Sequence, residues 1–127
     1  MKNFFSNLIK QGISEIDKVF DQIITQIMKP NMELEDLAKE YCKQFGDDII
    51  NEEKKKGLTY IGGTFKITYN NENSFLLSSE IYFQSKDKKI IKREIKSNNP
   101  QNSKYLTEKA VQELKNKKYI EYDIEEP

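Results

Sequence analysis

The chain has 127 residues and a mass of 15.0 kDa, and its 21 basic residues balance 21 acidic ones, so the formal net charge is zero. It contains no His and a single Cys, Cys42. These counts exclude a His-dependent nucleophile pair, a His/Cys zinc cluster and an intrachain disulfide, and leave only a carboxylate-bound metal open. We therefore expect a protein that is not an enzyme and uses no metal and no cofactor.

The first thirty residues contain no unbroken apolar stretch of the kind that a signal peptide or a membrane span needs. We therefore expect a soluble, cytoplasmic protein, and the single Cys suits a reducing compartment. Lys, Ile and Asn, which have AT-rich codons, are abundant, while Ala, Gly, Pro and Arg are scarce. This usage indicates an AT-rich genome, such as that of a low-GC bacterium or its phages.

A long amphipathic helix is predicted over residues 3–28, and Pro30 ends it. Its apolar residues recur at spacings of 4, 3, 4, 3 and 4, which is a heptad-like pattern. A small sheet is too short to cover the whole stripe, so a second helix packs along it, or a second copy or a partner protein does. A homodimer through this helix is therefore one alternative. The stripe consists of Ile9, Ile13, Ile16, Phe20, Ile23 and Ile27.

A second helix is predicted to begin after Asn31, which we expect to be its N-cap residue. Gly46 is compatible with an end of this helix or with its continuation towards Glu53. Acidic residues near the helix start suit the helix dipole and form an acidic surface that could mimic nucleic-acid phosphates. An ordinary solvated helix face is the alternative. This acidic surface consists of Glu33, Glu35, Asp36 and Glu40.

Three strands follow, because the apolar residues over 58–69, 75–83 and 89–96 alternate with polar ones. Gly62 and Gly63 indicate a bulge in the first strand, and the turns are predicted at 70–73 and 85–88. A helix over 104–117 and a strand over 120–124 complete the order α-α-β-β-β-α-β.

We expect an α+β fold in one domain, 1–127. Its two N-terminal helices lie within 1–57, an antiparallel sheet of three or four strands and one C-terminal helix occupy 58–124, and a disordered tail covers 125–127.

Basic residues are concentrated on the hairpin between the second and third strands. Alternation predicts Lys88, Lys92 and Lys96 on one strand face, opposite Ile91 and Ile95. These lysines could form a solvated face that protects a sheet edge, meet an acidic protein surface, or follow a phosphate backbone. The zero net charge and the single Arg argue against nucleic acid. The basic hairpin consists of Lys86, Lys88, Lys89, Lys92, Arg93 and Lys96.

The predicted order helix–strand–strand–strand–helix over 33–117 is similar to that of a double-stranded-RNA-binding domain. The basic start of that family's last helix is replaced here by Lys104-Tyr105-Leu106-Thr107-Glu108-Lys109, and its Gly-rich turn by Asn98-Asn99-Pro100-Gln101. We therefore assign the chain to no family.

The zero net charge hides segregation along the chain, because residues 31–57 sum to −3, residues 58–104 to +4 and residues 105–127 to −2. We expect a small non-catalytic protein-binding module that occludes a larger partner. An inhibitor from a phage or mobile element, of the anti-CRISPR or other anti-defence type, or an immunity protein would have this composition. The alternatives are a nucleic-acid-binding accessory protein that uses the hairpin over 85–96, and a homo-oligomeric structural protein.

Overall fold

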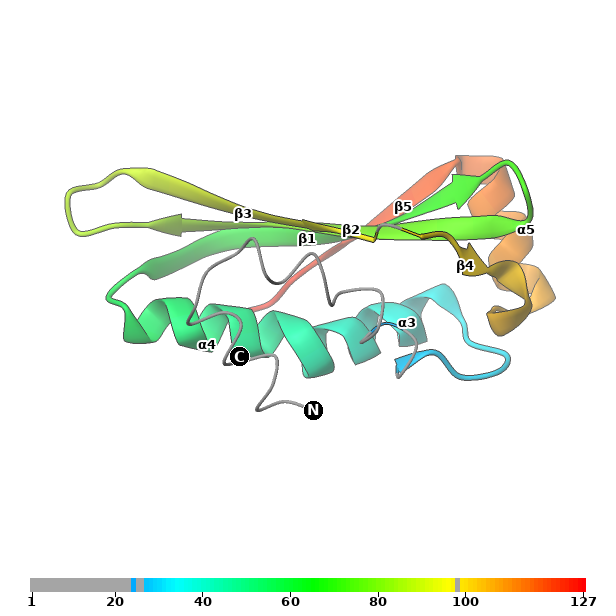
Figure 1. Cartoon of the computed structure of the whole chain (residues 1–127), viewed down its shortest axis with the longest axis horizontal. Coiled ribbons are helices and arrows are strands. Elements are labelled where there is room, and N and C mark those ends of the chain that lie inside the picture. The colour runs from blue at the N-terminus through cyan, green and yellow to red at the C-terminus, as the bar shows by residue number, and fades with distance from the viewer. Residues whose placement is uncertain (1–23, 25–26, 98) are drawn as a thin grey trace.

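The computed structural model describes Ile24, residues 27–97 and residues 99–127, and it confirms the α+β class. An antiparallel sheet forms one layer, and a helical rod crosses one of its faces (Figure 1). The strands run in the order β3-β2-β1-β5, and the short β4 pairs with the start of β2. Their bounds are β1 Thr59–Asn70, β2 Ser74–Gln84, β3 Ile90–Lys96, β4 Gln101–Asn102 and β5 Tyr119–Asp123.

The three-stranded meander predicted from alternation is confirmed by the pairing of β1 with β2 and of β2 with β3. Alternate residues of β2 are buried on the helix side: Phe75, Leu77, Ser79, Ile81 and Phe83. The β1–β2 turn follows Asn70, and Asn73 closes it with φ of 56°, a left-handed conformation that Asn tolerates. The short β4 is not among the strands predicted from the sequence.

The predicted bulge is confirmed in β1, but it lies just before the glycine pair: the β1–β2 register shifts between Tyr60 and Gly62, so Ile61 is the extra residue, and Gly63 pairs regularly with Ile81. Gly62 has φ of 154°. A Cβ atom at Gly63 would lie 2.9 Å from the main-chain oxygen of Glu80, a distance that real Cβ atoms do not reach. Glycine is therefore required here because the neighbouring strand approaches too closely for any side chain.

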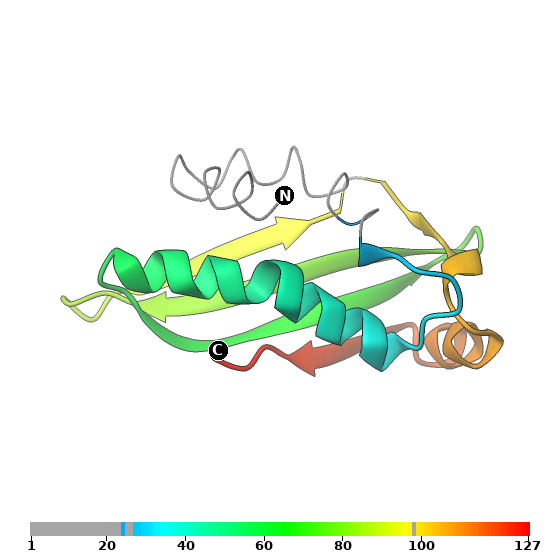
Figure 2. The same ribbon diagram turned by 90° about the horizontal axis from the view of Figure 1, so that it is seen from below.

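Residues 34–55 of the helical layer form one continuous rod (Figure 2). It consists of α3 (Leu34–Tyr41), a π-helical turn η1 (Cys42–Gly46) and α4 (Asp47–Lys55). Gly46 does not end the helix, and a Cβ atom there would lie 3.4 Å from Ile124 Cγ2. Of the two alternatives that the sequence left open, continuation is the one observed.

The prediction that Asn31 caps this helix is wrong. Glu33 occupies the N-cap position, and its side chain makes no capping hydrogen bond. Asn31 instead adopts φ of 58° in a turn, because the next residue, Met32, is held by the C-terminal half of the chain. The amide of Met32 donates to the Tyr105 oxygen at 2.8 Å, and its oxygen accepts from the Thr107 amide at 2.9 Å.

A short 3-10 turn, η2 (Ser103–Tyr105), leads into α5 (Glu108–Lys117), which lies at the end of the sheet near the β1–β2 turn (Figure 1). The Thr107 side chain accepts a hydrogen bond from the Ala110 amide at 3.1 Å. It thereby caps α5, as a threonine at an N-cap position is expected to do.

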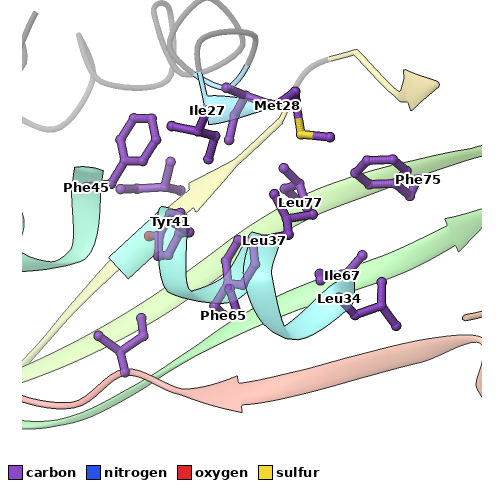
Figure 3. Packing of buried hydrophobic residues seen from close by; sticks show 14 of the residues in the cluster. Ile27, Met28, Leu34, Leu37, Tyr41, Phe45, Phe65, Ile67, Phe75 and Leu77 are labelled. Carbon is purple, nitrogen blue, oxygen red and sulfur yellow. The ribbon is translucent and has the colours of Figure 1, made fainter. Parts of the chain in front are cut away.

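The core lies between the rod and the sheet, with Tyr41 at its centre (Figure 3). Its ring stacks on Phe65 of β1, with centroids 4.2 Å apart, and on Phe45, with centroids 5.5 Å apart. The Tyr41 hydroxyl shares a hydrogen bond with the Ser79 hydroxyl, and both residues are buried. Burial raises the pKa of Tyr41 well above its ordinary value, so the hydroxyl stays protonated.

Most of the predicted first helix, with Ile9, Ile13, Ile16, Phe20 and Ile23, lies outside the described residues. Its last stripe residue, Ile27, is 3% exposed and belongs to the core described above.

Two glycine substitutions should separate close approach from helix propensity. We expect Gly63→Ala to lower the free energy of unfolding by about 1–3 kcal/mol, because the new Cβ clashes with the β2 backbone. Gly46→Ala replaces a helical glycine whose Cβ position is tight but not forbidden, so we expect no loss, or a gain of up to about 1 kcal/mol. Urea unfolding measures both. Equal losses for the two variants would contradict the conclusion that close backbone approach requires glycine at position 63 and not at position 46.

The buried hydroxyl pair can be tested by a double-mutant cycle. Tyr41→Phe leaves the Ser79 hydroxyl buried without this partner, and Ser79→Ala does the converse. We expect each to lower the free energy of unfolding by about 1–2 kcal/mol. The double variant should lose less than the sum, because neither unpaired hydroxyl remains. Strict additivity in chemical denaturation would show that the two hydroxyls do not interact.

Candidate functional site

The turn between β2 and β3 projects past the end of α4 at one end of the molecule (Figure 1). The Ser85 amide donates to the Lys89 oxygen at 2.9 Å, and the Lys88 amide donates to the Ser85 oxygen at 2.9 Å. The Ser85 hydroxyl also donates to Asp87, and this bond holds the pKa of the Asp87 carboxyl below its ordinary value. The tip of the hairpin is therefore fixed by local hydrogen bonds while Lys86, Lys88 and Lys89 stay exposed.

The strand register divides the predicted basic hairpin between two faces of the sheet. Lys92 pairs with Tyr82 and Lys96 with Ser78, so both occupy the face that the rod does not cover. Arg93 occupies the opposite face. Lys88 was predicted on the same strand face as Lys92, and this is wrong, because it lies in the turn with φ of 66°.

On the open face, the lysines of β3 alternate with carboxylates. Lys92 Nζ lies 3.2 Å from carboxylate oxygens of both Glu80 and Glu94, and Lys96 Nζ lies 3.0 Å from Glu94. Hydrogen bonds from Lys96 and then Lys92 lower the pKa of Glu94, and bonds to Glu94 and then Glu80 raise that of Lys92. These lysines are thus matched by neighbouring acids, which leaves little unbalanced positive charge for a phosphate backbone.

Arg93 faces the rod and forms an ion pair with a buried acid. The carboxylate of Glu53 on α4 is fully buried, and Arg93 Nη2 lies 3.4 Å from one of its oxygens. Lys56 Nζ lies 3.5 Å from the other oxygen. The Arg93 side chain is 27% exposed, so this pair joins β3 to the helical layer and is largely withdrawn from the surface.

Two exposed isoleucines lie at the same end of the sheet as the hairpin turn. Ile90 is 57% exposed and shares the open face with Lys92, while Ile61, the unpaired residue of the bulge, is 49% exposed. Tyr82 lies on the strand between β1 and β3: it pairs with Gly62, the neighbour of Ile61, on one side and with Lys92, two residues from Ile90, on the other. We call this area the hairpin surface. It consists of Ile61, Tyr82 and Ile90 with the lysines Lys86, Lys88, Lys89 and Lys92 around them.

The C-terminal lysines of α4 lie at this end as well. A Cβ atom at Gly57, which follows the helix, would lie 3.5 Å from Lys86 Cε. Lys54 pairs with Glu126 at 2.7 Å and Lys55 with Glu52 at 3.4 Å. The sequence could not reveal this neighbourhood, because roughly thirty residues separate α4 from the hairpin. Ile90 was not singled out from the sequence, although its even spacing from Lys92 is a signal that would have placed it on the same exposed face.

The predicted acidic surface lies on and just before α3, away from the hairpin turn (Figure 1). Glu35 pairs with Lys39 at 3.7 Å, and Glu40 pairs with Lys29 at 3.6 Å. Glu33 is half-buried and Asp36 is exposed. The acidic and basic predictions therefore correspond to separate surfaces.

Metal-ligand clusters and the single thiol were the two chemical features left open by the residue counts. No group of three or more Cys, Asp and Glu side chains in the described part of the chain is arranged to hold a metal ion. Burial first, and then Asp47 and Glu125, raise the pKa of the Cys42 thiol, which disfavours the reactive thiolate. None of the described helices is long and apolar enough to cross a bilayer.

The described residues define a two-layer α+β protein with helices on one face of an antiparallel sheet and an exposed hairpin at one end. No family model matches the chain, and neither a curated protein nor a solved structure shows significant similarity to it. The functional assignment therefore rests on the surfaces themselves.

A pair of substitutions should distinguish the two cations of β3. We expect Arg93→Met to lower the free energy of unfolding by about 2–4 kcal/mol, because it leaves the buried Glu53 carboxylate with only Lys56. Lys92→Met removes an exposed cation and should leave the unfolding midpoint nearly unchanged. Thermal or urea unfolding measures both. A second variant, Arg93→Met combined with Glu53→Gln, should recover part of the loss, and a deeper loss would contradict this explanation.

Proposed function

We propose that the chain is a non-catalytic protein-binding module that occludes part of a larger partner through the hairpin surface. The observation that carries the proposal is the exposure of Ile61 and Ile90 beside Tyr82, with lysines around them. Apolar centres with polar rims are typical of protein interfaces. An anti-defence inhibitor of a phage or mobile element, such as an anti-CRISPR protein, or an immunity protein would act in this way.

The charge around the apolar residues favours an acidic partner surface. Lys86 and Lys88 form no ion pair within the described residues, and the turn that carries them is held by hydrogen bonds of Ser85, which accepts from the Lys88 and Lys89 amides and donates to the Lys89 oxygen. A pre-ordered loop loses little conformational entropy on binding. The lysines would steer an acidic protein to the hairpin, and the isoleucines and Tyr82 would supply the buried contact area.

Nucleic acid is the less favoured partner for this surface. The only Arg of the chain pairs with Glu53, and Lys92 and Lys96 are matched by Glu80 and Glu94. Phosphate contacts require cations that are not already paired, and forked contacts favour Arg. Exposed isoleucines also add nothing to the binding of a phosphate backbone.

Site-specific photocrosslinking in the native host tests the proposal. A benzophenone-bearing amino acid in place of Ile90 should crosslink one protein, and the same group in place of Gln112, exposed on α5, should not. The crosslinked protein, once purified, should bind the chain directly. We expect the triple variant Lys86→Glu, Lys88→Glu, Ile90→Asp to weaken this binding at least about tenfold.

The matched control is Lys104→Glu, Lys109→Glu, which reverses two exposed lysines at the other end of the molecule and should leave binding unchanged. Crosslinks at position 90 to nucleic acid, with binding that weakens steeply as salt rises, would replace the proposal with the nucleic-acid alternative. Equal weakening by the control and the triple variant would show that the hairpin surface is not the interface.

A further inference from the structure

A second surface, separate from the hairpin, lies along the edge of the sheet formed by β5. This strand pairs with β1 on one side, and no described strand lies on the other. The Ile124 amide donates to the Gly63 oxygen of the β1 strand at 2.9 Å. Amides in antiparallel strands alternate in direction, so those of Glu121 and Asp123 point away from β1 and find no strand partner there.

A groove of about 520 Å³ runs beside this edge, between β5 with the C-terminal residues and the rod. Its apolar lining comes from Ala38, Cys42 and Tyr122. Tyr122 pairs with the buried Phe65, so its side chain lies on the helix side of the sheet. A further strand added beyond β5 would place its helix-side residues over this groove.

The groove is acidic. It is lined by five carboxylates and two lysines: Glu35, Asp47, Asp123, Glu125 and Glu126, with Lys39 and Lys43. Glu35 is paired with Lys39 and Glu126 with Lys54. Within the described part of the chain, Asp47, Asp123 and Glu125 form no ion pair. Glu121 adds another exposed acid on the open face of β5.

We propose that the β5 edge binds an extended, lysine- or arginine-rich segment of a partner protein as an additional strand. Main-chain hydrogen bonds to Glu121 and Asp123 supply the pairing, as in other cases of strand addition. Apolar side chains of the segment cover Ala38, Cys42 and Tyr122, and its basic side chains lie beside the acidic ones. This goes beyond the proposed function, since it uses a different surface and a partner of opposite charge.

The charges of β5 argue against a second copy of this chain as the occupant. In a two-fold antiparallel pair centred on Glu121, that carboxylate would lie directly opposite its own symmetry mate. Acidic residues also protect an exposed edge from strands that carry no positive charge. With a basic segment as the added strand, the same acidic residues form cross-strand ion pairs.

The test uses a synthetic peptide of alternating lysine and valine, and a matched peptide of alternating glutamate and valine. We expect the basic peptide to bind the full-length chain with a dissociation constant on the order of 10–100 µM and to weaken as salt rises. Bound peptide should also slow alkylation of Cys42, the only thiol, because that thiol lies in the groove. The acidic peptide should produce neither effect.

Two edge variants separate main-chain pairing from charge. Glu121→Pro removes an outward amide without touching the β1 ladder and should abolish peptide binding, while Glu121→Gln keeps the amide and should weaken binding only a few-fold. The double variant Asp47→Lys, Glu125→Lys should abolish binding. The control Glu72→Lys, Glu108→Lys changes two acids of a separate groove, between the β1–β2 turn and α5, and should not. Circular dichroism and the unfolding midpoint confirm that each variant folds.

Equal binding of the basic peptide to wild type and Glu121→Pro would overturn the proposal, as would alkylation of Cys42 at the same rate with and without peptide. Concentration-dependent self-association that Glu121→Pro removes would also overturn it, because the occupant would then be a second copy. Loss of peptide binding in the hairpin triple variant would show that the peptide binds the hairpin surface, which would likewise contradict the proposal. Failure of the hairpin crosslink leaves these outcomes unaffected.

Discussion

The packing of one helical rod against one face of the sheet is the constraint on which the rest of this structure depends. Tyr41 lies between Phe45 and Phe65 and shares a hydrogen bond with Ser79, so a single residue joins the rod to two strands. Gly46 lets the π-helical turn approach Ile124, and Gly63 lets β1 approach β2. Because the rod covers only one face of the sheet, no described helix covers the other face, and no described strand pairs with the outer edge of β5.

Among the described residues, the buried apolar side chains lie between the rod and the sheet, and the exposed surfaces differ from one another in charge. On the open face, Lys92 and Lys96 alternate with Glu80 and Glu94, which is how an antiparallel sheet tolerates water on one side. Unbalanced charge remains at two other places. The hairpin turn is basic and adjoins exposed isoleucines, while the groove beside β5 is acidic and has an apolar lining. A chain of zero net charge thereby presents one basic and one acidic surface.

The sequence predicted the strands well, because period-two alternation and Asn-rich turns are local signals. The glycine pair indicated a bulge for the same reason, and the bulge lies just before it, at Ile61. The Asn31 cap was wrong because a tertiary contact, Met32 with Tyr105 and Thr107, sets the backbone there. For the candidate site, alternation placed Lys92 and Lys96 correctly but could not show that Arg93 would meet Glu53, forty residues away. Ion pairing across such distances follows from strand register and helix position, which no local pattern contains.

Taken alone, the sequence determined the class of fold and the chemistry that this chain cannot perform with histidine or disulfides, because residue counts and periodicity are properties of the chain itself. Only the tertiary structure decided which charges remain available. It paired Arg93 with Glu53 and the open-face lysines with acids, and it left Lys86 and Lys88 beside Ile90 and the β5 edge beside an acidic groove. The physical reason is that ion pairing and burial depend on which segments meet in space.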